Sequence, residues 1–330
     1  MSVDLGPVLD ERRSFSRVRL DAVRASLKKR EAEQILGAAG VVYATGSMAR
    51  GDASRHSDLD AFILSHETNG KRALTNLDSI RLKSALIDVI RDEGLPDFSD
   101  DGKFLTVHTI DEMLTKLGTA EDDYENLFTA RMLLLLESVP LLGKGAYADV
   151  LQRVVDKYWI DYPGNESDFL PVFLTNDIIR YWKVLCLNYE AFTSTEPVSK
   201  RRHQNYKLKF SRLLTCYSAI VYLLALVRAN GRATREDGMV LASISPLERL
   251  LWVAETLNDR EIDAHISRML ATYVVFLRTT DAPKGDMRTR FEDDEYNAAR
   301  RKEAKTFGDD MFDLMQRVGG QTPLYRYLVV

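Results

Sequence analysis

The sequence predicts an α+β protein in which a small α/β domain precedes a long helical region. Three short apolar runs with strand character occur before residue 111 and are separated by stretches whose apolar residues recur at helical spacing. Beyond Asp111 strand signals almost disappear, and amphipathic helical segments follow one another. A chain of 330 residues is long enough for about two domains. We therefore expect an N-terminal helical segment at 1–36, an α/β domain at 37–143 and a helical domain at 144–330.

Glycines and the spacing of apolar residues define the expected elements of the first two segments. Between Arg12 and Leu36 apolar residues recur at roughly helical spacing among many charges, and Gly37 ends the pattern. The short run Val41–Ala44 is β-prone and leads into the turn Gly46-Ser47. Further expected elements are a strand at 59–64, a helix at 72–92 and a strand at 103–110.

The C-terminal half is expected to be built from helices alone. Helical periodicity covers residues 124–138, 145–159, 167–193, 203–229, 245–256, 259–279 and 290–317. The most apolar run, Leu213–Val227, is shorter than the roughly 20 residues that cross a bilayer, so it predicts a buried core helix. Residues 1–20 mix acids and arginines without an apolar core, which argues against a signal peptide. We expect a cytoplasmic protein without a membrane partner.

The amino-acid composition argues against several classes of protein. The chain is 45% hydrophobic and 28% charged, which is typical of a globular protein and not of a disordered one. Its net charge of -4 argues against a protein whose main task is to coat nucleic acid. The two cysteines, Cys186 and Cys216, lie in separate helical stretches. They predict neither a disulfide framework nor a zinc site.

The stretch Thr45–Leu64 carries the most chemical information. A strand that leads into Gly46-Ser47 at the start of a short helix offers backbone N–H groups where a phosphate chain binds well. Asp58 and Asp60 are two residues apart at the start of the next expected strand, so both carboxylates project from one face. Paired carboxylates suit Mg²⁺, which binds them together with water and substrate phosphates. The stretch thus predicts a site for a nucleotide and metal ions.

This pattern resembles the DNA polymerase β nucleotidyltransferase superfamily. That superfamily has a strand, Gly-Ser, a short helix and then Asp-x-Asp on the next strand, and Gly46-Ser47 and Asp58-Leu59-Asp60 match in spacing as well as type. The resemblance implies a small mixed-sheet nucleotidyltransferase domain followed by a helical domain. It also implies an NTP substrate and Mg²⁺, or Mn²⁺ in its place, bound by Asp58 and Asp60.

A narrower resemblance points to a bacterial branch of the superfamily. The branch includes the uridylyltransferase domain of the enzyme that modifies the nitrogen-regulatory PII protein. There too a strand ending near Thr109–Glu112 is followed by a helix like Ala130–Glu137 and by a turn like Pro140–Gly143. This chain is similar to stand-alone members of that branch. A chain of 330 residues is not expected to contain the hydrolase and ligand-sensing domains of the full PII-modifying enzyme, so that enzyme's specific role is not implied.

The expected third strand lacks an acid that many superfamily members carry. In those members a third acidic residue binds metal or acts as general base for the attacking hydroxyl. The strand at 103–110 has no acid, but His108 is a candidate base near neutral pH, with a structural histidine as the alternative. Asp97, Asp100 and Asp101 in the preceding loop are further candidates to reach the site.

Other polar residues are candidates for binding the nucleotide. Arg50 and Ser57 lie within the motif and resemble the bacterial members, although Arg50 could equally form a surface salt bridge. Asp177 and Arg180 are three residues apart on one helix, where they line the nucleotide cleft or simply pair with each other. Lys207 belongs to a basic run beginning at 200, which suits a triphosphate or a polyanionic acceptor, or a solvated helix start.

These features together predict an enzyme that transfers a nucleoside monophosphate from an NTP to an acceptor hydroxyl and releases pyrophosphate. ATP is the expected donor. The acceptor is a protein, a small molecule or an RNA end. One alternative of a different class is a nucleotide-binding regulator that has lost a catalytic acid. A nucleotidyltransferase toxin and a signalling-nucleotide synthase are alternatives with the same chemistry.

Overall fold

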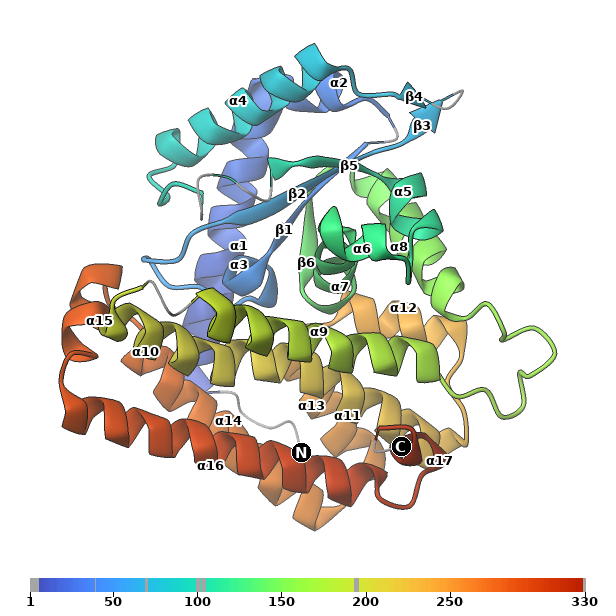
Figure 1. Cartoon of the computed structure of the whole chain (residues 1–330), viewed down its shortest axis with the longest axis vertical. Helices are drawn as coiled ribbons and strands as arrows, with labels where there is room; N and C mark the ends of the chain where they lie inside the picture. Colours follow the sequence, from blue (N-terminus) through green and yellow to red (C-terminus); the bar gives the residue numbers. More distant parts are fainter. Residues whose placement is uncertain are drawn as a thin grey trace. The chain divides into compact units, whose positions relative to one another are not determined.

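The computed structural model describes residues 6–38, 40–68, 71–98, 102, 105–192 and 196–328. The chain divides into two compact units, of which one comprises Pro7–Lys157 and the other is built on Tyr158–Val330. Figure 1 shows the sheet with its helices in the first unit and helices alone in the second. This confirms the expected α+β class, with a small sheet near the N-terminus and a largely helical C-terminal region.

A mixed sheet forms the centre of the first unit. Among the described residues its four strands lie in the order β5-β2-β1-β6, with β1 antiparallel to both of its neighbours and β2 parallel to β5. The elements are α1 (Gly6–Lys29), α2 (Ala32–Leu36), β1 (Val41–Thr45), α3 (Gly46–Arg50), β2 (Asp60–Ser65), β3 (Glu67–Thr68), β4 (Lys71–Arg72), α4 (Asn76–Asp92), β5 (Val107–Thr109), α5 (Ile110–Thr115), α6 (Ala120–Tyr124), α7 (Leu127–Leu136), β6 (Ser138–Leu142) and α8 (Lys144–Tyr158).

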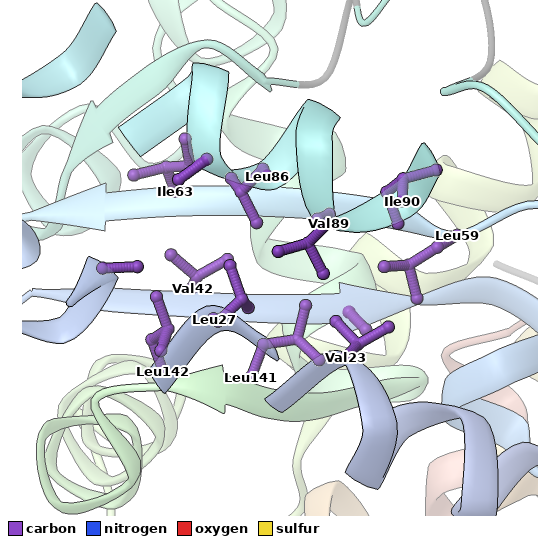
Figure 2. Packing of buried hydrophobic residues seen from close by; sticks show 14 of the residues in the cluster. Val23, Leu27, Val42, Leu59, Ile63, Leu86, Val89, Ile90, Leu141 and Leu142 are labelled. Carbon is purple, nitrogen blue, oxygen red and sulfur yellow. The ribbon is translucent and has the colours of Figure 1, made fainter. Parts of the chain in front are cut away.

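The two central strands are buried on both faces. On one face Val42 of β1 and Ile63 of β2 meet leucines and valines of α1 and α4, as Figure 2 shows. On the other face the rings of Tyr43 and Phe62 stack with centroids 5.4 Å apart. The Tyr43 hydroxyl donates a hydrogen bond of 2.9 Å to the carbonyl oxygen of Ala130 in α7. Burial on both faces explains why these strands read as continuous apolar runs in the sequence.

The sequence did not predict β6, because helices alone were expected beyond residue 111. Instead α7 ends at Leu136 and Ser138–Leu142 pairs with β1. Pro140 has no N–H to donate, and it is accommodated because β6 lies at the edge of the sheet. The turn after β6 needs a glycine: Gly143 has φ +70°, and a Cβ there would lie 2.0 Å from the carbonyl oxygen of Gly40.

The third expected strand is shorter in the structure. β5 covers only Val107–Thr109, whereas the sequence predicted a strand at 103–110; residues 103 and 104 lie outside the described ranges. Thr109 ends the strand because its hydroxyl accepts from the N–H of Glu112 while the Glu112 carboxylate accepts from the N–H of Thr109. This reciprocal pair is a capping box, which starts α5 at the next residue.

The described residues of the second unit form helices and connecting turns, with no strand among them. Its elements are α9 (Val172–Phe192), α10 (Val198–Lys207), the π-helical turn η2 (Leu208–Arg212), α11 (Leu213–Asn230), α12 (Arg235–Ser243), α13 (Pro246–Leu257), α14 (Arg260–Thr279), α15 (Lys284–Arg290), α16 (Asp294–Gly319) and α17 (Pro323–Arg326). Phe210 of η2 stacks on Phe276 and Phe307, with centroids 4.7 Å apart in both pairs. These rings join α14 and α16 to the continuous helical segment Val198–Asn230, which contains η2.

The central helix of this unit is the continuous segment Val198–Asn230. Within the described ranges it is the one helix long and apolar enough to cross a membrane, but 89% of its most apolar window is buried inside the chain's own fold. The core helix of a soluble protein also meets that criterion of length and apolarity. The burial agrees with the core helix expected at Leu213–Val227, and the absence of a membrane partner stays a prediction.

His203 of α10 is expected to make the stability of the second unit depend on pH. Its ring stacks on Phe291, with centroids 5.6 Å apart. Burial, followed by the charges of Lys207, Arg288 and Lys284, lowers the pKa of His203 from 6.5 to about 4. Between these values the unfolded chain binds more protons than the folded one, so the free energy of unfolding falls as the pH drops from 6.5 to 4.

Protonation of His203 is expected to lower the free energy of unfolding by roughly 3 kcal/mol between pH 6.5 and pH 4. We expect the His203→Gln variant to lose less stability than the wild type between pH 6.5 and pH 4. Urea unfolding of both proteins at several pH values measures the difference. Parallel stability curves for the two proteins would contradict the assignment.

Candidate active site

The site is built on the junction between β1 and α3. Thr45, the last residue of β1, lies directly opposite Asp60 in the antiparallel pairing with β2. The next residue, Gly46, has φ +74°, a backbone conformation that residues other than glycine rarely adopt. A Cβ at Gly46 would lie 3.6 Å from the Asp60 Oδ2 atom. Glycine therefore both permits the turn and keeps the space beside this carboxylate open.

Asp58 and Asp60 flank a residue that points into the core. Leu59 is 1% exposed and belongs to the hydrophobic cluster of the first unit, whereas both aspartates are half-buried. This pattern agrees with the expected alternation, although β2 begins only at Asp60 and Asp58 precedes the strand. Gly46 and Ser47 lie at the first two positions of α3, and Ser47 is half-buried. The register thus places Asp60 beside the Gly46-Ser47 turn.

Ser57 belongs to a tight turn that leads into Asp58. Its hydroxyl oxygen accepts a 2.9 Å hydrogen bond from the N–H of Ser54, and its own N–H donates to the Ser54 carbonyl oxygen at 3.0 Å. The Ser54 hydroxyl in turn accepts from the N–H of His56. These bonds shape the segment before the aspartates, and a nucleotide contact of Ser57 stays a prediction.

Arg50 is fixed in a buried ion-pair network. Its guanidinium donates to both carboxylate oxygens of Asp52 at 2.9 and 3.1 Å and to Glu137 at 2.8 Å. The side chains of these three residues are exposed by 6%, 2% and 0%. The network ties α3 to the residue that precedes β6. These contacts give Arg50 a positioning role in the fold, and its contact with a phosphate stays a prediction.

Glu137 was not among the residues singled out from the sequence. Its signal was an acid directly after the apolar run Met132–Leu136, because an acid in such a position is buried only when it is paired. Its partner Arg50 lies 87 residues earlier in the chain. No pattern in the sequence connects the two positions.

His108 lies in β5, and its expected role as catalytic base stays a prediction. His108 is opposite Leu64, four residues along β2 from Asp60 and so roughly 13 Å away at about 3.3 Å per residue. It is 4% exposed, and burial lowers the pKa of His108 while nearby Glu112 opposes that shift. The alternative of a structural histidine fits this position.

A third acid is not found beside the aspartate pair in the described ranges. Asp97 has a side chain that is 81% exposed and lies 3.7 Å from Arg91. Asp100 and Asp101, the other loop candidates, lie outside the described residues. Within the described ranges no group of three or more histidine, cysteine, aspartate and glutamate side chains is arranged to hold a metal ion. The metal-ligating candidates are therefore the two aspartates of the motif.

The remaining nucleotide-binding candidates belong to the second unit. Asp177 of α9 is 6% exposed, accepts a 2.7 Å hydrogen bond from the Tyr158 hydroxyl and pairs with Arg180 at 3.4 Å. This confirms the intrahelical pair considered as the alternative, while a role at the nucleotide stays a prediction. Lys207 ends α10 and is exposed. Its contact with a nucleotide is also untested.

A comparison with known protein families finds a match, and it covers the segment that carries this site. Residues 26–103 match the family model of the nucleotidyltransferase domain. The matched stretch contains β1, α3 and β2, and so includes Gly46, Ser47, Asp58 and Asp60. The match supports the resemblance to the polymerase β-like superfamily. Searches of the curated proteins and of the solved structures give no match, and the resemblance to the PII-modifying branch stays a prediction.

Proposed function

We propose that the protein is a Mg²⁺-dependent nucleotidyltransferase that moves a nucleoside monophosphate from ATP to an acceptor hydroxyl. The observation that supports this proposal best is the Asp60 carboxylate held beside Gly46 at the start of α3, inside the nucleotidyltransferase domain. In the reaction the acceptor oxygen bonds to the α-phosphorus and loses its proton. The bond from the α-phosphorus to the bridging oxygen breaks, and pyrophosphate leaves.

The β1–α3 junction is proposed to hold the phosphates of the donor. Gly46 lets the ligand approach the backbone closely, and the N–H groups at the start of α3 are donors without a partner earlier in the helix ladder. The Ser47 hydroxyl adds a further donor. Since Arg50 anchors α3 to Glu137, these donors keep a fixed direction before the substrate arrives.

The donor set fits a magnesium ion. Mg²⁺ prefers oxygen ligands and is bound in many enzymes through one or two carboxylates, water and substrate phosphates. Asp58 and Asp60 supply two carboxylates that are half-buried and so are reachable by solvent and substrate. The ion would neutralise the phosphate charge and stabilise the attacking and leaving oxygens. Mn²⁺ has the same ligand preference and is expected to substitute.

A radioactive transfer assay tests the proposal. The purified protein is incubated with each α-³²P-labelled NTP and Mg²⁺ or Mn²⁺, alone and with a cell extract. We expect label from ATP to pass to a protein, a small molecule or an RNA, which then identifies the acceptor class. The Asp58→Asn/Asp60→Asn variant is expected to transfer no label, because both proposed metal ligands are lost.

A control variant with two other Asp→Asn changes distinguishes loss of the proposed metal ligands from loss of negative charge alone. Asp88 and Asp92 lie one turn apart on α4, and their side chains are 45% and 60% exposed. The Asp88→Asn/Asp92→Asn variant makes the same chemical change in the same unit and should transfer label normally. Binding of NTP without transfer under every condition would favour the second candidate, a nucleotide-binding regulator. That candidate is supported by the described site, which has two acids and not three.

A further inference from the structure

A cationic cavity lies within the second unit. It has a volume of about 380 Å³ and is bordered by α9, α10, η2 and α16 together with Phe291 after α15. The charged side chains that line it are Arg201, Arg202, Lys209, Arg300 and Arg301. None of the lining residues that the structure describes is acidic. Arg201, Arg202 and Arg300 are half-buried, whereas Lys209 and Arg301 are exposed, so five cations border one cavity in a chain of net charge -4.

Acids elsewhere in the unit compensate only part of this charge. Arg202 pairs with Asp294 at 2.7 Å, and Arg300 pairs with Glu303 at 2.7 Å. Arg201, Lys209 and Arg301 belong to none of the ion pairs found among the described residues, although the charge of Glu190 helps to raise the pKa of the neighbouring Tyr189 hydroxyl. The Nε atom of Arg300 is buried and has no hydrogen-bond partner among the described residues. The cavity therefore holds positive charge and donor capacity that the fold itself does not satisfy.

The rest of the lining adds neutral hydrogen-bond donors and a buried aromatic side chain. The amides of Asn205 and Asn297 border the cavity, and Asn297 is 9% exposed. Phe291 is fully buried and closes one side, so this part of the wall is held by packing. The Tyr189 hydroxyl donates to the carbonyl oxygen of Arg201 at 3.2 Å and ties α9 to α10. The cationic groups thus extend from helices that are packed together.

We propose that this cavity binds a small ligand that carries two or more linked phosphate groups. A diphosphate offers several closely spaced anionic oxygens, which the planar guanidinium groups of Arg201 and Arg301 can bind in pairs. The volume lies within the range of small-molecule sites. All lining residues belong to the second unit, and the binding needs neither the aspartate pair nor a metal ion. The proposal therefore does not depend on the proposed transfer reaction.

Calorimetric titration of the full chain with inorganic pyrophosphate tests the proposal. EDTA is present throughout, so that the aspartate pair has no metal ion through which to hold phosphate. We expect one equivalent of pyrophosphate to bind. The Arg201→Gln/Arg301→Gln variant should bind at least about 10-fold more weakly, because two charge-assisted contacts are lost. The Asp58→Asn/Asp60→Asn variant should bind like the wild type.

A charge-matched variant checks that the effect is local. Arg260 and Arg326 are exposed residues of the same unit and do not line the cavity. The Arg260→Gln/Arg326→Gln variant loses the same charge and should bind pyrophosphate normally. Equal weakening in this variant would overturn the proposal, as would absence of pyrophosphate binding by the wild type in EDTA. Thermal unfolding of each variant confirms that it is folded.

A parallel titration with ADP identifies the form of the ligand. Tighter binding of ADP than of pyrophosphate supports a nucleotide in the cavity, whereas equal binding supports a bare oligophosphate. Loss of binding in the Asp58→Asn/Asp60→Asn variant would assign the phosphate to the aspartate site and overturn the proposal. Failure of the labelling assay leaves these outcomes unchanged, so the two proposals are tested separately.

Discussion

The Asp60→Asn variant is expected to transfer nucleotide about 10³-fold more slowly than the wild type while remaining folded. A bound metal ion would stabilise charge in the transition state by several kcal/mol, and the loss of one of its ligands removes part of that stabilisation. Each 1.36 kcal/mol corresponds to a factor of ten in rate. Asp60 lies opposite Thr45 and beside the open space at Gly46, so a change of one carboxylate oxygen to an amide alters the site with little change of shape.

Single-turnover measurements with labelled ATP give the rate constants of the wild type and the variant. We expect the Asp58→Asn variant to be similarly slow, because Asp58 is the other proposed ligand. The Asp88→Asn variant of the exposed surface of α4 serves as the control and should keep the wild-type rate. If Asp60→Asn transfers nucleotide within a factor of ten of the wild type, Asp60 is not a metal ligand of the reaction.

The Arg50→Met variant is expected to lose about 3–5 kcal/mol of unfolding free energy in the first unit. Methionine has a similar length but no charge, so the carboxylates of Asp52 and Glu137 lose the guanidinium that now lies between them. Both side chains are almost fully buried, where an anion that loses its partner is costly. Equilibrium unfolding in urea at pH 7 measures the loss.

A comparison variant and a double variant test this explanation. Arg55 lies in the same connection between α3 and β2 but is exposed, and Arg55→Met should change stability by less than about 0.5 kcal/mol. Adding Glu137→Gln to Arg50→Met removes one of the two buried anions and should recover part of the lost stability. Equal losses for Arg50→Met and Arg55→Met would show that the buried network stabilises the unit no more than a surface arginine does.

Local sequence was sufficient to locate the first part of the site. The run Val41–Ala44 and the glycine after it predict a strand and a turn from neighbouring residues alone, and the structure has both. The alternation at Asp58-Leu59-Asp60 is equally local, since it follows from the side-chain period of an extended backbone. A motif that depends on the spacing of adjacent residues can be predicted without knowledge of the fold.

Only the tertiary structure decided which distant segments meet. Ser138–Leu142 becomes a strand because β1 offers it an edge, and Glu137 is tolerated in the core because Arg50 reaches it from α3. His108 is on the third strand as expected, and only the strand pairing decided that it lies opposite Leu64. Strand pairing and ion pairing join residues that are tens of positions apart. The sequence by itself therefore determined the residues of the motif, while the pairing between segments decided which neighbours they have.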